Sequence, residues 1–381
     1  MNTPLDRALF PVTQHFNYLN HAAVGILPIP TRDAVIEFTH THSDTGILGV
    51  FPYELRLPEY RAEIARFIGV DSDEIAILRN TGDGANAIAA GLRWESGDEI
   101  ILGDNEFPSN AYPWLACRDF GVKVRLLETG KQRLTPDVLR AHMTKRTRIV
   151  TLSWVSFEDG YRHDLAALAE IAHEYGAWLC VDVMQALGAF PLDARATGID
   201  AVYAGGAKWL MALQGVSFLY LRKPLIEELR VAAPGWRSRE NIWDFLKYDQ
   251  PIVSDATRFE GGTLNIVGAL SLAQSMRVLA AAEDRIAKHV LNLTDQLYEG
   301  ISRLGGRIIS DRRRETSSGI VTFTIPHCDP IAMGKTLQKE KIVTTYRSNG
   351  IRVSPHGYNT HGEINHLLDV VSQAMPVLAA V

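Results

Sequence analysis

The sequence has few cysteines, no excess of positive charge and no long apolar run. Only three cysteines occur, Cys117, Cys180 and Cys328, without metal-ligand spacing or a framework of pairs. The formal net charge is −5, and the one dense basic stretch, 311–316, is typical of a turn. No run approaches the roughly 18 apolar residues of a membrane span, and the N-terminal stretch lacks a signal-peptide core. These absences predict a cytoplasmic globular protein without a nucleic-acid, membrane or metal partner.

Short apolar runs alternate with segments of helical periodicity, such as 165–176. The runs are 75–80, 99–104, 122–127, 148–154, 177–183, 201–206 and 216–222. This alternation predicts an α/β fold with a mainly parallel seven-stranded sheet and helices on both faces. The last two runs are separated by a segment too short for a helical crossover, so we expect the seventh strand to run antiparallel.

The pattern changes in the second half of the chain. Residues 223–262 are irregular and rich in Trp, Pro and charge, too long for a simple linker. A helical repeat of apolar residues follows between Ile286 and Leu304, and then two strand-like runs, 319–326 and 350–355. We therefore predict an N-terminal arm at 1–20, a large α/β domain at 21–264 and a small α+β domain at 265–381.

A single charged residue, Lys208, interrupts the glycine-containing apolar segment "YAGGAKWLMALQGVSFLYL". Asp182 ends a predicted strand about one strand–helix–strand repeat earlier, so both residues are expected at the carboxyl edge of neighbouring strands. Lys208 could be a solvated loop lysine, and Asp182 could be a helix cap. Together they also suit pyridoxal phosphate (PLP), which needs a lysine for a Schiff base and an acid beside its pyridine nitrogen.

The turn "RNTGDGANAIAAGL" at 79–92 follows a strand and opens an apolar helix. Backbone N–H groups near Thr81 and Gly82 would meet an anion such as a phosphate at the helix N-terminus. A glycine-containing turn is a weak signal by itself, and many such turns are only turns. It gains weight because it is predicted on the same edge of the sheet as Lys208.

Five stretches resemble the class V aminotransferase family of PLP-dependent enzymes, in its isopenicillin N epimerase-like and cysteine desulfurase-like branches. The longest is "VDVMQALGAFPLDARATGIDAVYAGGAKWLMALQGVSFLYLR"; the others are "YLNHAAVGILP", "EFPSNAYPW", "RFEGGTLN" and "IRVSPHGYNTHGEI". They span nearly the whole chain in the family's order. The resemblance implies a PLP-dependent transferase type I fold, with PLP as the cofactor.

The resemblance also implies roles for individual residues. Lys208 matches the Schiff-base lysine, Asp182 the partner of the pyridine nitrogen, and Gln185 the group that binds the phenolic oxygen of the ring. Phe107 falls where an aromatic or histidine side chain stacks on the ring, although an aromatic beside proline is also common in packing. Thr263 matches a residue that reaches the phosphate of the other subunit, which implies a homodimer with shared sites.

Two residues match substrate-binding positions of the family, and two depart from its pattern. Arg352 matches the arginine that clamps a substrate carboxylate, although a strand arginine is often a surface charge. His21 lies near the substrate mouth by analogy, or is structural. Gly205 and Ala207 replace the Ser and His that many relatives carry before the lysine, so the phosphate would depend more on backbone N–H groups and on the two threonines.

The predicted function is that of a PLP-dependent enzyme acting on an amino acid or related amine through a quinonoid-type Cα carbanion. Transamination, epimerisation and elimination such as C–S cleavage stay open, with Lys208 as the proton carrier in each. The alternative is a catalytically silent PLP-fold protein that binds or regulates. A persulfide-forming cysteine desulfurase is not expected, because the segment 340–352 before the arginine has no cysteine.

Overall fold

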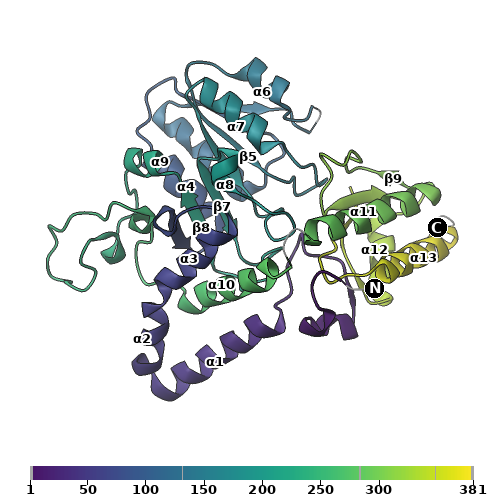
Figure 1. The fold of residues 1–381 in the computed structure, drawn as a ribbon. Coiled ribbons are helices and arrows are strands. Elements are labelled where there is room, and N and C mark those ends of the chain that lie inside the picture. Colours follow the sequence, from purple (N-terminus) through teal and green to yellow (C-terminus); the bar gives the residue numbers. More distant parts are fainter. Residues whose placement is uncertain (1–2, 131, 283–284, 348, 379–381) are drawn as a thin grey trace.

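A computed structural model describes residues 3–130, 132–282, 285–347 and 349–378 of the chain (Figure 1). The centre is a seven-stranded sheet in the order β2-β8-β7-β6-β5-β3-β4. Its strands are β2 (Ile75–Leu78), β3 (Glu99–Gly103), β4 (Lys123–Leu127), β5 (Thr147–Ser153), β6 (Trp178–Asp182), β7 (Ala201–Gly205) and β8 (Ser217–Leu221). All seven predicted strands are confirmed. β8 runs antiparallel to both β7 and β2, as predicted, and the other pairs are parallel.

Helices cover both faces of this sheet. The helices of the first two thirds of the chain are α1 (Ile29–Thr45), α2 (Ile47–Leu55), α3 (Leu57–Phe67), α4 (Thr81–Gly91), α5 (Pro108–Leu115), α6 (Pro136–His142), α7 (Leu165–Glu174), α8 (Ala194–Thr197), α9 (Lys223–Glu228) and α10 (Ile266–Ala280). Apolar side chains of α4, α5 and α9 pack on one face, and those of α3, α7 and α10 on the other. Coverage of both faces explains why the central strands are almost continuously apolar.

The last part of the chain forms a second, smaller assembly, on the right in Figure 1. It contains α11 (Arg285–Arg303), β9 (Arg307–Ile308), β10 (Val321–Thr324), α12 (Pro330–Lys339), β11 (Ile342–Val343), β12 (Thr345–Arg347), β13 (Gly350–Val353) and α13 (His361–Leu378). An antiparallel sheet of order β12-β13-β10-β9 shares an apolar core with α11, α12 and α13. This assembly is the predicted smaller α+β part.

Other contacts bear on the predicted domain limits. Near the N-terminus, β1 (Asn17–Tyr18) pairs in parallel with β11, so the start of the chain is joined to the smaller assembly. α10, which begins just after residue 264, packs against α1 and α3 of the large sheet assembly. The division at residues 20 and 264 stays a prediction.

The irregular region 223–262 begins with α9 and continues mainly as turns and short 3-10 helices. Part of it extends away from the sheet, on the left in Figure 1. Trp243, Phe245 and Tyr248 are exposed there.

Among the described helices, no single one has the length and apolarity of a membrane span. α10 and α11 satisfy these criteria only as a pair, by length and composition, with a bend of 78° at a break that includes residues outside the described ranges.

Candidate active site

The Lys208 segment lies at the carboxyl end of β7 and is fixed by the N-terminal part of the chain. Gly25 N donates a hydrogen bond to Ala207 O at 2.7 Å. A Cβ atom on Gly25 would lie only 1.9 Å from Lys208 O, so this close approach of two backbones requires glycine. The "YLNHAAVGILP" stretch therefore packs directly against the loop that carries Lys208.

The Lys208 amine lies over an aromatic ring and has a low pKa. Nζ is 5.3 Å from the centroid of the Phe107 ring. Burial lowers the pKa of Lys208 to about 8; the nearby Asp182 carboxylate opposes this shift, and Arg352 adds to it. About a tenth of the amine is therefore neutral, and nucleophilic, at pH 7, far more than for an ordinary lysine.

Asp182 ends β6 with one carboxylate oxygen fixed and the other available. The side chain is 4% exposed. Oδ1 accepts a hydrogen bond from Met184 N at 2.7 Å, and no described residue donates one to Oδ2. Burial raises the pKa of Asp182 to about 7, against the effect of the Met184 bond. A buried carboxylate with a free oxygen favours a cationic partner at that oxygen.

The turn that opens α4 lies on the same edge of the sheet, as predicted. Gly205 N donates to Thr81 Oγ1 at 3.1 Å, which joins the start of α4 to the end of β7. Within the described chain, the backbone N–H groups of Thr81 and Gly82 make no hydrogen bond. A Cβ atom on Gly205 would lie 3.3 Å from Met184 Cε, so Met184 occupies the space beside the glycine. The free N–H groups can receive an anion.

Arg352 lies on β13, near enough to Lys208 to lower the pKa of that amine, and has no ion-pair partner among the described residues. It is 8% exposed, and its Nη1 donates to Phe157 O at 2.6 Å. Its buried Nε has no hydrogen-bond partner. Burial lowers the pKa of Arg352 to about 10, and nearby Arg347 adds to this effect. A buried, unpaired guanidinium is unfavourable unless an anion binds it, and a carboxylate matches its geometry.

Gln185 and His21 are bonded within the protein. Gln185 Oε1 accepts from Trp209 Nε1 at 3.0 Å, and its Nε2 donates one hydrogen to Ala22 O at 3.0 Å. His21 is fully buried, with Nε2 at 2.8 Å from the Tyr358 hydroxyl. Burial lowers the pKa of His21 well below its usual value, so the ring is neutral. These bonds favour a structural contribution from both residues, and their contacts with cofactor and substrate stay predictions.

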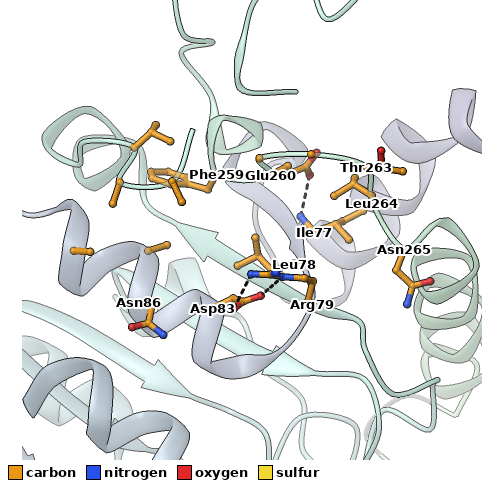
Figure 2. A pocket seen from close by; sticks show the side chains of 17 residues that line it. Ile77, Leu78, Arg79, Asp83, Asn86, Phe259, Glu260, Thr263, Leu264 and Asn265 are labelled. Atoms are coloured by element: carbon orange, nitrogen blue, oxygen red, sulfur yellow. Dashed lines mark hydrogen bonds and ion pairs between the residues drawn. The ribbon is translucent and has the colours of Figure 1, made fainter. Parts of the chain in front are cut away.

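Thr263 does not lie beside Lys208 and Asp182; it lies on the wall of a separate cavity of about 450 Å³. Figure 2 shows it with the Arg79–Asp83 ion pair and Glu260, between α4 and the segment before α10. Thr263 is exposed, and neither Lys208 nor Asp182 lines this cavity. Thr263 thus lines a cavity together with α4 and is exposed to another molecule.

Glu106 was not identified from the sequence. It lies just before Phe107, and its carboxylate accepts hydrogen bonds from Ser153 N, Ser153 Oγ and Asn110 Nδ2 at 2.8, 2.6 and 2.9 Å. Burial raises its pKa. Only its position in the quoted stretch "EFPSNAYPW" could have indicated it, because a lone glutamate in a loop carries no signal of its own.

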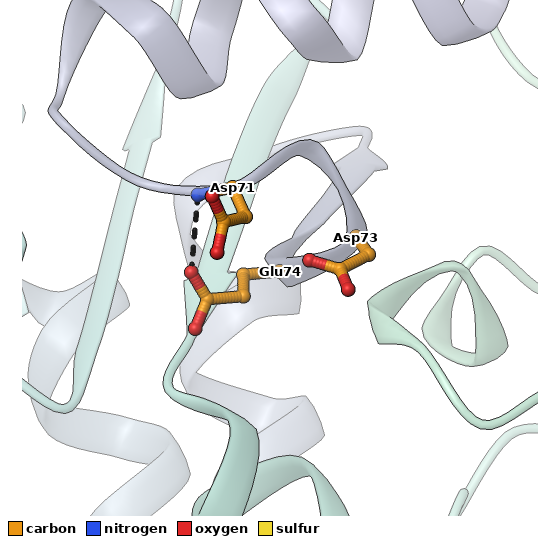
Figure 3. A group of neighbouring side chains, drawn as sticks. All are labelled: Asp71, Asp73 and Glu74. Atoms are coloured by element: carbon orange, nitrogen blue, oxygen red, sulfur yellow. Dashed lines mark hydrogen bonds between the residues drawn. The ribbon is translucent and has the colours of Figure 1, made fainter.

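Two other groups of reactive side chains are explained without a ligand. Asp71, Asp73 and Glu74 form the acidic cluster in Figure 3, and Arg195 and Lys223 pair with it. All three cysteines are buried, and burial raises the pKa of each thiol, that of Cys117 to about 12. Neutral buried thiols are poor nucleophiles.

The sequence profile of the family Aminotransferase class-V matches residues 18–367, so the chain belongs to the class V aminotransferase family. A protein named a probable cysteine desulfurase, from Methanothermobacter thermautotrophicus, is 29% identical, with 98% of each chain covered.

Two solved structures share the fold. The apo cysteine desulfurase from Thermococcus onnurineus has a TM-score of 0.89 at 24% identity, covering 100% of this chain and 99% of that one. The cystine C–S lyase C-DES, in complex with cysteine persulfide, has a TM-score of 0.87 at 24% identity, covering 95% of this chain and 99% of that one. These matches confirm the predicted type I fold.

Membership of the family makes this protein a PLP-dependent enzyme, and the residues present fit the cofactor. Lys208, with an amine of low pKa, would hold the cofactor covalently, the free oxygen of Asp182 could pair with a ring nitrogen, and the free N–H groups at the N-terminus of α4 could bind the phosphate. When bound, PLP withdraws electrons from the Cα of an attached amino acid.

Proposed function

We propose that this enzyme cleaves a C–S bond in a sulfur-containing amino acid by β-elimination. The observation that carries the amino-acid part is Arg352, a buried guanidinium with an unbonded Nε and no described ion-pair partner, close enough to Lys208 to lower its pKa. A substrate carboxylate would complete the hydrogen bonds of Arg352 and hold the Cα–H bond near the Lys208 amine.

In this proposal Lys208 removes the Cα proton once its amine is free. The electron pair of the C–H bond then forms a Cα–Cβ double bond, and the sulfur leaves with the electron pair of the C–S bond. The leaving sulfur takes up a proton, and hydrolysis of the unsaturated amino acid gives pyruvate and ammonia. Atoms and electrons balance without an added oxidant or reductant.

The sulfur would leave with a product and not on an enzyme cysteine. The chain resembles a probable cysteine desulfurase in sequence and both a desulfurase and a cystine C–S lyase in fold. Cys117 and Cys180 lie in the core of the large sheet, and Cys328 in that of the smaller assembly. Phe107, beside Lys208, has no titratable group that could deprotonate a substrate thiol. Both observations favour a lyase over a persulfide-forming enzyme.

The test is a product assay with cystine, cysteine and S-methylcysteine, measuring pyruvate, ammonia and released sulfur. Substitution of all three cysteines by alanine should leave the rate of pyruvate formation within about twofold, apart from stability losses of roughly 1–3 kcal/mol each. Loss of sulfur release in a folded Cys328→Ala variant would instead support a persulfide-forming cysteine desulfurase. Transfer of the amino group to a keto acid, or racemisation without cleavage, would replace the lyase proposal.

We further propose a homodimer in which Thr263 of the partner subunit contacts the cofactor phosphate. Two observations support it. Thr263 is exposed on a cavity that does not include its own Lys208, and among the described residues at the start of α4 the phosphate would meet Thr81 and backbone N–H groups. Light scattering gives the oligomeric state, and subunit exchange tests the sharing of sites.

A further inference from the structure

A buried polar network flanks Asp182 on both sides. In the sheet register Asp182 lies directly between Ser153 on β5 and Tyr203 on β7. Ser153 donates to Glu106 through both its backbone N–H and its hydroxyl, as described above. On the other side, Tyr203 OH donates to Asn110 Oδ1 at 2.6 Å, and Asn110 Nδ2 donates to Glu106 at 2.9 Å. Both neighbours of Asp182 are therefore connected to one carboxylate.

The remaining titratable groups around this network are neutral near pH 7. Burial lowers the pKa of His163, whose Nδ1 lies 2.9 Å from Ser153 O, to about 4. Burial also raises the pKa of Tyr203 and of Cys180 well above their usual values. The charges that face Asp182 are those of Glu106 and Lys208, since each shifts its pKa directly.

We propose that Glu106 is a positioning residue for Asp182: it fixes both register neighbours of that carboxylate, and its negative charge favours retention of a proton at the ring end of the site. In this proposal Asp182 is the residue that would contact the cofactor, and Glu106 acts on the cofactor through Asp182. A buried pair of carboxyl groups retains a proton more strongly than either carboxyl group alone, because the first negative charge opposes the second. The proposal rests on PLP binding and is independent of the substrate and of C–S cleavage.

The test is a pH titration of the visible absorption of the PLP-loaded enzyme without substrate. Glu106→Gln removes the charge while keeping the shape, so a proton should leave the ring end more easily. We expect the midpoint of the spectral transition to fall by about one pH unit. Glu106→Asp, which keeps the charge but withdraws it toward the backbone, should shift the midpoint in the same direction by less.

Thr151→Val is the matched control, because it removes hydrogen bonds to Asn110 and Tyr203 in the same network without touching Glu106 and without changing a charge. It should lower the melting temperature but leave the midpoint within about 0.3 pH unit. If Glu106→Gln does not fold, the midpoint of Glu106→Asp decides the test. An unchanged midpoint in a folded, PLP-loaded Glu106 variant overturns the proposal, as does a Thr151→Val shift as large as that of Glu106→Gln. Loss of C–S cleavage alone would not bear on it.

Discussion

The candidate site has a ring end, around Asp182 and Lys208, and a phosphate end, at the start of α4. The two ends differ in how much of each is contributed by a single chain. At the ring end, Asp182 and Lys208 are largely enclosed by their own chain, and their pKa values are shifted to about 7 and 8. At the phosphate end, a single chain offers Thr81 and free backbone N–H groups, and Thr263 lies on a separate cavity. The pKa shifts at the ring end thus arise within one chain, whereas the proposed homodimer would complete the phosphate end with Thr263 of a second chain.

Lys208→Ala is expected to have the largest effect, because Lys208 is the proposed covalent attachment point of the cofactor and the proposed proton carrier. We expect kcat to fall by at least about 10³-fold. Borohydride reduction of the wild-type holoenzyme and peptide mapping should find the label on Lys208. A label on any other lysine would refute the assignment of Lys208 as the attachment residue.

Asp182→Asn should come next, since it keeps the shape of the carboxylate but removes the charge that we propose stabilises a protonated ring nitrogen. We expect kcat to fall on the order of 10²-fold, with melting temperature close to that of the wild type. Steady-state kinetics and thermal denaturation test this. Near-normal turnover would mean that Asp182 acts only through its bond to Met184 N.

The ring end should also respond to pH. Only the neutral Lys208 amine reacts with an aldehyde, and its lowered pKa of about 8 sets the neutral fraction. The rate of PLP attachment to the apoenzyme should therefore rise about tenfold per pH unit below 8 and level off above it. Stopped-flow absorption measures the rate. Thr263→Ala serves as the control at the phosphate end. If the pH at which the attachment rate levels off shifted in that variant, the separation of the two ends would be contradicted.

Thr263→Ala should have the smallest effect. The loss of one hydrogen bond to phosphate corresponds to about 1 kcal/mol, or roughly fivefold weaker PLP retention, measured by dialysis against a phosphate buffer. Mixing Lys208→Ala chains with Thr263→Ala chains would create heterodimers in which one site carries both defects and the other neither. The intact site should then retain PLP as tightly as the wild type, and no recovery of wild-type PLP retention after confirmed subunit exchange would count against shared sites.

Much of the fold could be predicted because local patterns determine it. Burial on both faces gives the strands continuous apolar runs, and the short connection before 216–222 required an antiparallel last strand. Placing Asp182 and Lys208 at one edge followed from the same topology. The hydrogen bonds around these residues could not be predicted, because they join residues that are distant in sequence. They are the bonds of Gly25 to Ala207, of Trp209 to Gln185 and of His21 to the Tyr358 hydroxyl.

The sequence alone predicts a helix-opening turn, an acid and a lysine, each after a strand, and an arginine near the C-terminus. The electrostatic state of these groups depends on the folded chain. The pKa values of Asp182, Lys208 and Arg352 depend on burial and on charges brought close by folding, and Glu106 joins the site only because β5 and β7 lie on either side of β6. Burial and distance between charges are properties of packing, which no local pattern specifies.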